Sequence, residues 1–225
     1  MLRVIAVDGP AGAGKSTSSR ALARRLGFAY VDTGAMYRAV GVLARERRLA
    51  FDDDAALAQL AAALRFEIDP GGERLVVDGR DLSTIIRRAD AGELASRVSE
   101  RPVVRERLVA LQRRLGEAGG VVMEGRDIGT VVFPDAALKL YLTADPATRA
   151  RRRAVELQAR GEAVDEAVLA RDLAARDRRD SGRASSPLRP AADAVVLDTT
   201  RLALEAVVDE MERLARARLV GRLSE

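Results

Sequence analysis

The sequence predicts an α/β fold, an open parallel β-sheet with helices on both of its faces. Short apolar strands alternate with helical stretches at both ends of the chain, and a glycine-rich turn follows the first strand. Polar clusters at 32–33, 124–127 and 198–199 each follow a strand, where ligands of such sheets bind. The 225 residues, 48% hydrophobic and 32% charged, are typical of a globular protein. This composition excludes collagen-like and wholly disordered structures.

Hydrophobic periodicity, turn residues and capping residues give the individual elements. In chain order they are strand 3–7, helix 15–26, strand 28–31, helix 35–47, a helix beginning at Asp52, strands 64–68, 75–77 and 80–82, a helix beginning at Pro102, strands 121–123 and 138–142, a helix capped by Asp145, a helix around 176–183, strand 194–197 and helix 202–218. In the helix after Pro102 the apolar face is expected to comprise Val104, Leu108, Leu111 and Leu115.

The middle of the chain departs from the α/β pattern. Apolar and polar residues alternate from 64 to 68, a Pro-Gly-Gly turn follows at 70–72, and Asp78-Gly79 is a strong two-residue hairpin signal. These features predict a small antiparallel meander of three strands inserted into the parallel architecture.

The chain has no cysteine and no histidine. Disulfides, thiol nucleophiles, histidine zinc sites and Ser-His-Asp triads are therefore excluded. The chemistry that remains is that of carboxylates, arginines, hydroxyls and the backbone. Residues 1–7 lack a cleavage signal, and nowhere do eighteen apolar residues run together, so we expect a cytoplasmic protein with no membrane partner.

The net charge of +4 is local. Residues 149–189 contain 11 arginines against seven acidic residues, and the rest of the chain is balanced. Only 3% of the residues are aromatic, which leaves little material for stacking nucleic-acid bases. The pattern favours one site for a small anion over a nucleic-acid partner, although a non-catalytic basic binding module stays open as an alternative.

The glycine-rich turn carries the strongest functional signal. It reads Gly9-Pro10-Ala11-Gly12-Ala13-Gly14-Lys15-Ser16, directly after a predicted strand and directly before a predicted helix. In this P-loop pattern backbone N–H groups surround phosphates, the lysine reaches the β- and γ-phosphates, and the serine hydroxyl binds Mg²⁺. The motif predicts a site for ATP with Mg²⁺. A GTPase is excluded because neither lysine lies in an Asn-Lys-x-Asp motif.

The phosphoryl acceptor has to be inferred from other residues. Arg38 and the pair Arg126-Asp127 follow two strands of the predicted sheet, so we expect them at one crevice. Guanidinium groups suit a phosphate, and a fixed carboxylate suits the exocyclic amine of a base. Residues 176, 180 and 183 have the spacing of one helix face, which either closes over ribose and phosphate or forms a solvated ion pair.

At this point the sequence resembles the bacterial cytidylate kinases, a family of nucleoside monophosphate kinases. The resemblance spans nearly the whole chain, and its most specific block is residues 125–135. The matching segments are Gly9–Ser16, Asp32–Arg38, Gly125–Asp135, Arg176–Arg183 and Pro190–Ala194. It implies a core of residues 1–33 and 103–225 with a lid at about 149–165, and a monophosphate-binding region of 34–102 that carries the inserted sheet.

The resemblance also implies roles for individual residues. For the acceptor CMP, the phosphate would be bound by Arg38 and Arg126, with Tyr37 beside them, and cytosine would be read by Ser96, Arg105 and Asp127. The sugar hydroxyls would be bound by Arg176 and Asp180, and Arg183 would swing in with bound substrate. Thr33 stands where a serine is frequent, which bears on the sugar preference. ATP would be bound by residues 9–17, a segment that ends at Thr17, and by Arg149, Arg152 and Arg153. The catalytic residues would be Lys15, Arg38, Arg126 and Arg153.

For some of these residues a purely structural role is the alternative interpretation. Ser96 could be a helix cap, Arg105 a surface arginine, and the arginines at 149–153 a solvated helix face.

The implied reaction transfers the γ-phosphoryl group of ATP to CMP or dCMP. It needs no general base, because the attacking phosphate oxygen is already anionic. The rival activity is that of another small P-loop kinase, acting on shikimate or AMP. Without a heptad seam or an apolar stripe, a monomer is expected.

Overall fold

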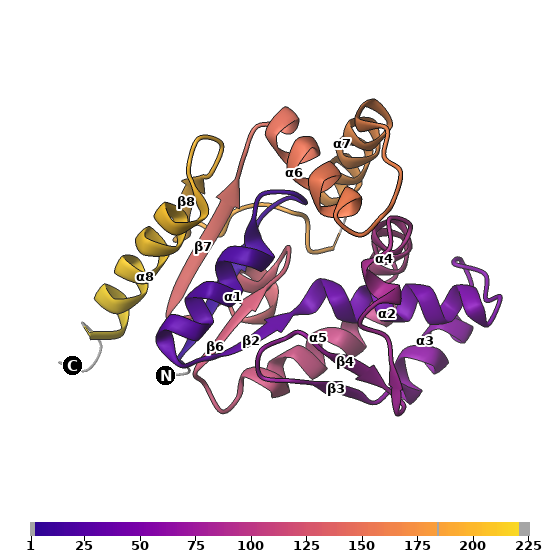
Figure 1. Ribbon diagram of the computed structural model, residues 1–225. Coiled ribbons are helices and arrows are strands. Elements are labelled where there is room, and N and C mark those ends of the chain that lie inside the picture. Colours follow the sequence, from indigo (N-terminus) through magenta and orange to yellow (C-terminus); the bar gives the residue numbers. More distant parts are fainter. Residues whose placement is uncertain (1–2, 184, 221–225) are drawn as a thin grey trace.

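The computed structural model describes residues 3–183 and 185–220, and it contains two separate sheets (Figure 1). The larger sheet has five strands in the order β2-β6-β1-β7-β8, and every neighbouring pair is parallel. Its strands are β1 Val4–Asp8, β2 Ala29–Asp32, β6 Val121–Glu124, β7 Leu138–Thr143 and β8 Val195–Asp198. Residues 1–2 and 221–225, which belong to the predicted core, lie outside the described residues.

Helices lie on both faces of this sheet, as predicted, and further helices pack in the inserted region. They are α1 Lys15–Leu26, α2 Thr33–Glu46, α3 Asp54–Ala63, α4 Ala91–Ser99, α5 Pro102–Gly116, α6 Pro146–Gln158, α7 Glu166–Gly182 and α8 Leu204–Val220, with a 3-10 turn η1 Ile85–Arg87 and a π-helical turn η2 Ile128–Val132. Because successive side chains of a strand point to opposite faces, Ile5 packs with α1 and α8, whereas Val4 packs with η2.

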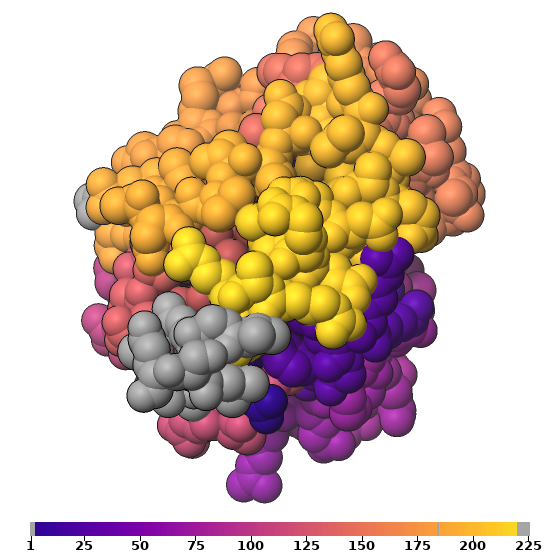
Figure 2. Space-filling view, turned by 90° about the vertical axis from the view of Figure 1, so that its left-hand side faces the viewer, coloured from indigo at the N-terminus to yellow at the C-terminus, as the bar shows by residue number. Residues whose placement is uncertain are grey.

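Helices α1 and α8, from opposite ends of the chain, lie against each other. Figure 2 shows the yellow C-terminal segment directly beside the indigo N-terminal one. Buried residues of both helices share one hydrophobic cluster with the sheet. The two helices are also joined by ion pairs, in which Arg25 of α1 pairs with Glu205 (2.6 Å), Asp209 (2.6 Å) and Glu212 (3.0 Å) of α8.

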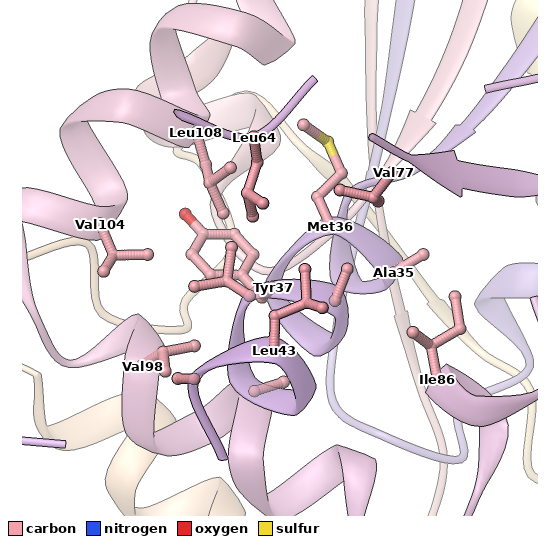
Figure 3. Close-up of a cluster of buried hydrophobic side chains, with 14 of the residues drawn as sticks. Ala35, Met36, Tyr37, Leu43, Leu64, Val77, Ile86, Val98, Val104 and Leu108 are labelled. Carbon is pink, nitrogen blue, oxygen red and sulfur yellow. The ribbon is translucent and has the colours of Figure 1, made fainter. Parts of the chain in front are cut away.

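A separate cluster of apolar side chains, the second core of the protein, lies between α2, α3, α5 and the smaller sheet (Figure 3). The smaller sheet is antiparallel with strands β3 Phe66–Ile68, β4 Leu75–Val77 and β5 Arg80–Asp81, as the alternating pattern predicts. This second core gives the inserted region its own apolar support. The domain division inferred from the family resemblance stays a prediction.

Several local expectations are corrected. The helix expected from Asp52 begins at Asp54, because the Asp53 carboxylate caps it by accepting a hydrogen bond from the Ala56 N–H (2.9 Å). Leu115 does not lie on the buried face of α5 but is 37% exposed. Arg183 is not on the helix with Asp180; it is the residue after α7. No sequence pattern predicts α4 or η2. Asp145 does cap α6, accepting from the Thr148 N–H (2.8 Å).

Within the described ranges, 3–183 and 185–220, no helix has the length and apolar character needed to cross a membrane.

The turn between β3 and β4 docks on the edge of the larger sheet. The Pro70 carbonyl accepts a hydrogen bond from the Tyr30 N–H (2.9 Å), and Gly72, at φ +64°, lies against the Tyr30 ring. A Cβ atom on Gly72 would come within 2.2 Å of that ring. Arg24 and Glu73 form an ion pair beside the same contact (2.9 Å). The inserted sheet is thus attached directly to the strand that ends at Asp32.

This contact predicts a position-specific cost for Gly72→Ala. The alanine would meet both an unfavourable positive φ and the Tyr30 ring, so we expect a loss of about 2–4 kcal/mol in the free energy of unfolding. Gly79→Ala is the matched control, because Gly79 has φ +77° but open space around it, and it should lose about 1 kcal/mol. Equal losses in urea denaturation would contradict the docking contact.

Candidate active site

The P-loop lies between the carboxyl end of β1 and the first turn of α1. Close backbone approach explains two of its glycines. A Cβ atom on Gly9 would lie 2.0 Å from the Leu142 carbonyl oxygen, and one on Gly12 would lie 2.7 Å from that of Arg149. The loop is therefore held against the end of β7 and against α6. The loop runs into the N-terminus of α1, the positive end of the helix dipole, which is suited to an anion.

Lys15 is buried in the P-loop and donates a hydrogen bond to the Pro10 carbonyl oxygen (2.8 Å). Burial, followed by repulsion from Arg126, lowers the pKa of its ammonium group to about 7, although Glu124 opposes the shift. An ammonium group in this position lacks a sufficient counter-charge. Bound phosphate would supply that charge.

Two carboxylates lie beneath the loop at the ends of β2 and β6. Asp32 caps α2, accepting from the Ala35 N–H (2.9 Å), and pairs with Arg38 (2.5 Å). Although burial acts to raise it, the pKa of Asp32 is lowered, chiefly by Arg38. Glu124 accepts a hydrogen bond from the Tyr30 hydroxyl, and burial followed by the charge of Asp32 raises its pKa.

Glu124 is a residue for which the sequence assigned no role. Its Oε2 atom is buried and has no hydrogen-bond partner among the described residues, and Ser16 lies close enough to lower its pKa. The signal for it was its place at the end of the strand next to β1, within a cluster already expected at the ligand-binding edge. Across the described residues no group of three or more acidic side chains is placed to hold a metal alone.

A further group of charged residues in the site is organised around Asp180, whose side chain is 1% exposed. Its carboxylate pairs with Arg126 (3.0 Å), Arg176 (3.8 Å) and Arg183. Burial acts against ionisation, but these arginines, Arg126 first, keep the pKa of Asp180 lowered. Burial and then Arg126 lower the pKa of Arg176 to about 9. Three guanidinium groups around one carboxylate leave an excess of positive charge.

Arg105 and Asp127 form a second buried ion pair, each only 5% exposed. The reading of Arg105 as a surface arginine is therefore wrong. Ser96 is 1% exposed and lies inside α4, so it is not a helix cap either. Its hydroxyl accepts from Arg179 Nε (3.4 Å) and lies 3.5 Å from Asp180 Oδ1.

Tyr37 borders the same cleft as Arg38 and Arg126, but it is 8% exposed and belongs to an apolar cluster. Its ring packs among Leu64, Val104 and Leu108 in the apolar cluster of Figure 3, and the Arg105 guanidinium lies 5.8 Å from its ring centroid. The hydroxyl is buried without a partner among the described residues, and burial raises its pKa to about 12. Tyr37 forms a wall of the site through its ring.

Two arginines of α6, Arg149 and Arg152, have different surroundings. Arg149 is buried and bonded to the carbonyls of Ala144 (3.1 Å) and Ala11 (3.2 Å) and to Asp177 (2.5 Å). It is therefore neither solvated nor free to clamp a phosphate from this position, and it connects the P-loop to α7. Arg152 does face the site, where it donates to Thr199 Oγ1 (2.8 Å).

A single cleft of about 940 Å³ brings most of the predicted residues together. The following residues border it: Ala11, Gly12, Ala13, Gly14, Lys15, Ser16, Thr17, Thr33, Tyr37, Arg38, Arg105, Arg126, Asp127, Arg152, Arg153, Arg176, Asp180 and Arg183. Gly9, Pro10, Ser96 and Arg149 do not border it. Arg160, which sequence reasoning missed, does. The volume is within the usual range for small-molecule sites.

The parallel sheet and the glycine-rich loop with Lys15 together define a P-loop protein. A gluconokinase structure from Sinorhizobium meliloti 1021 has the same fold, with a TM-score of 0.52 and 14% identity, covering 98% of this chain and 95% of that one.

Comparison of sequences is more specific. The family model described as Cytidylate kinase matches residues 5–217. The cytidylate kinase of Geobacter sp. (strain M21) is 47% identical over 96% of this chain and 94% of its own. That of Pelotomaculum thermopropionicum is 50% identical over 91% and 92%. The chain belongs to the cytidylate kinase family.

The state of Lys15 predicts that nucleotide binding takes up a proton. With a pKa of about 7 in the free protein, Lys15 is mainly neutral at pH 8, and adjacent phosphates raise that pKa. Binding of ATP at pH 8 should therefore take up about one proton, and affinity should fall as pH rises above 7. Titration calorimetry in buffers of different ionisation enthalpy measures the uptake. It should vanish in Lys15→Met and persist in Lys139→Met; uptake that survives in Lys15→Met would refute the assignment.

Proposed function

We propose that this protein is a cytidylate kinase that transfers the γ-phosphoryl group of ATP to CMP or dCMP, giving ADP and CDP or dCDP. The observation that carries the proposal is the composition of the one cleft. A P-loop with its lysine borders one part of it, and the buried Arg105–Asp127 pair and the arginines around Asp180 border another. Family membership supports the same reaction.

On the donor side, residues 9–17 surround the triphosphate, and Lys15, Arg152 and Arg153 contact its oxygens. Arg152 and Arg153 border the cleft from α6. Arg149 acts indirectly in this proposal: by bonding the Ala11 carbonyl (3.2 Å) and Asp177, it fixes the loop relative to α7.

On the acceptor side, the phosphate of CMP binds Arg38 and Arg126, which now pair with Asp32 and Asp180. The Asp127 carboxylate accepts from the exocyclic amine of cytosine, with Arg105 beside it. Arg176, Asp180 and Arg183 are close to the sugar. The Thr33 hydroxyl donates a hydrogen bond to the Glu124 backbone carbonyl (2.7 Å). In this proposal Thr33 therefore acts by holding the backbone at Glu124. Ser96 supports Asp180 rather than facing the cleft.

The residues present fit a magnesium ion bound with the substrate phosphates. Mg²⁺ usually takes one or two protein ligands and keeps phosphate oxygens and waters for the rest. The Ser16 hydroxyl and the Oε2 atom of Glu124, which has no hydrogen-bond partner in the described part of the chain, are the groups that would hold it. Bound there, the ion would neutralise charge on the β- and γ-phosphates.

The chemistry requires positioning and charge neutralisation. An anionic phosphate oxygen of CMP attacks the γ-phosphorus in line, the bond to the β-phosphate bridging oxygen breaks, and ADP leaves. No side chain has to remove a proton, which agrees with a chain without histidine. Lys15 and the arginines offset the negative charge that the transition state spreads over the phosphoryl oxygens.

Water has to be kept from the γ-phosphate. The segment between α6 and α7 meets the segment before α4, where Arg160 Nη1 donates to the Arg87 carbonyl (2.8 Å) and Glu162 accepts from the Ala89 N–H (3.1 Å). These contacts join the two segments beside the cleft, and in this proposal they restrict the access of water to it. We propose further that the protein acts as a monomer on these small molecules in the cytoplasm, which light scattering and cell fractionation would test.

A panel of acceptors tests the activity. ADP release is measured with MgATP and each of CMP, dCMP, UMP, AMP and shikimate, and without acceptor. CMP or dCMP should be the preferred substrate, and hydrolysis without acceptor should be much slower. Lys15→Met should lower kcat by about 10²-fold or more, whereas Lys139→Met should not. ADP release only with AMP or shikimate, or RNA binding without ADP release, would overturn the proposal.

The role of Asp127 is tested separately. Asp127→Ala should reduce discrimination between CMP and UMP by about 1–3 kcal/mol, because the variant no longer offers an acceptor to the cytosine amine. The ratio of the two kcat/KM values measures this effect and corrects for any general damage. An unchanged ratio, with both values falling equally, would mean that Asp127 does not read the base.

A further inference from the structure

Asp8 is a buried carboxylate that the proposed mechanism does not use. It ends β1, one residue before the P-loop, and is 4% exposed. Both of its oxygens accept hydrogen bonds from the backbone: Oδ1 from the Ile128 N–H (2.9 Å) and Oδ2 from the Gly129 N–H (2.8 Å). These donors lie 120 residues further along the chain, in the turn η2.

The surroundings of Asp8 show that its burial is costly. Burial raises the pKa of its carboxyl group to about 6; the two backbone bonds and Lys15 oppose the shift, and Asp127 adds to it. Tyr141 is its neighbour on β7, and the Lys139 side chain packs on Gly129. A carboxylate held in such a place has to gain from the bonds it makes.

Those bonds connect the two halves of the site. Ile128 and Gly129 directly follow Arg126 and Asp127, the proposed ligands of the CMP phosphate and base. The strand that ends at Asp8 continues into the P-loop. One side chain thus links the backbone that leads to the donor phosphates with the backbone that presents the acceptor. The approach is close, since a Cβ atom on Gly129 would lie 3.4 Å from Asp8 Oδ2.

We propose that Asp8 is a positioning residue that fixes the Arg126-Asp127 segment relative to the P-loop and thereby sets recognition of the acceptor nucleotide. It is not a catalytic residue, because it does not border the cleft. The inference rests on the proposed function, in which Asp127 reads the base. It predicts an effect on the acceptor that is larger than any effect on ATP.

Asp8→Asn is the direct test, because it keeps the size of the side chain. Its amide oxygen accepts one of the two bonds, while its NH₂ group faces the other N–H donor. We expect KM for CMP to rise about tenfold, KM for ATP to stay within about twofold, and the CMP-to-UMP ratio of kcat/KM to fall. Amide hydrogen exchange at residues 126–132 should accelerate.

Asp193→Asn is the matched control. Its carboxylate pairs with Lys139 (2.8 Å) in the same neighbourhood, but the side chain is 67% exposed, and all these constants should stay within about twofold. If Asp8→Asn does not fold, Gly129→Ala displaces one donor from the other side: its Cβ would lie 3.1 Å from Lys139 Cδ. It should give the same selective rise in KM for CMP.

The outcomes separate this inference from the proposed function. If the unmodified protein phosphorylates CMP but the folded Asp8→Asn variant changes KM for CMP and ATP by the same factor, or neither, the positioning role is overturned and the activity stands. If the unmodified protein does not phosphorylate CMP, the proposed function fails. In that case unaltered exchange at residues 126–132 would overturn the structural link as well.

Discussion

Positive charge that is gathered in a buried cleft needs negative charge opposite it, whether or not a substrate is bound. In this structure Asp180 supplies that charge to Arg126, Arg176 and Arg183, and Asp32 supplies it to Arg38. A buried guanidinium group without a partner would destabilise the fold by several kcal/mol. The carboxylates therefore keep the arginines in place before a phosphate arrives. The site is organised in advance. In the proposed function, the phosphate of the acceptor replaces a carboxylate as the partner of Arg38 and Arg126.

The parts of this arrangement that the sequence predicted are those with local causes. The P-loop pattern sets the start of α1 at Lys15, and Gly27, with φ +67°, ends that helix where expected. The parallel strands were recognisable because they are short, apolar and separated by turns. Polar residues at their carboxyl ends then had to meet, which is why most of the predicted site residues border one cleft.

The parts that could not be predicted depend on segments far apart in the chain. Nothing near residue 149 indicates that its guanidinium is buried against Ala11 and Asp177 instead of facing a ligand. The turn η2 is stabilised by Asp8, which lies 120 residues earlier. Periodicity within a window of eleven to eighteen residues contains no information about either contact. Tyr37 shows the same limit, because its ring packs against Leu64, Val104 and Leu108, which lie far along the chain from it.

The inserted sheet also has a place in this network. Its turn packs through Gly72 on Tyr30, and the Tyr30 hydroxyl donates to Glu124, the carboxylate beside Ser16. Because the reaction needs no proton acceptor, its rate depends on how accurately donor and acceptor phosphates are held, and small displacements are costly. The inserted region is attached to the core through Tyr30, the residue that donates to Glu124, and it therefore bears on where this carboxylate beside the P-loop lies. Contacts of this kind, outside the cleft, help to fix where Lys15, the arginines and the carboxylates of the cleft lie.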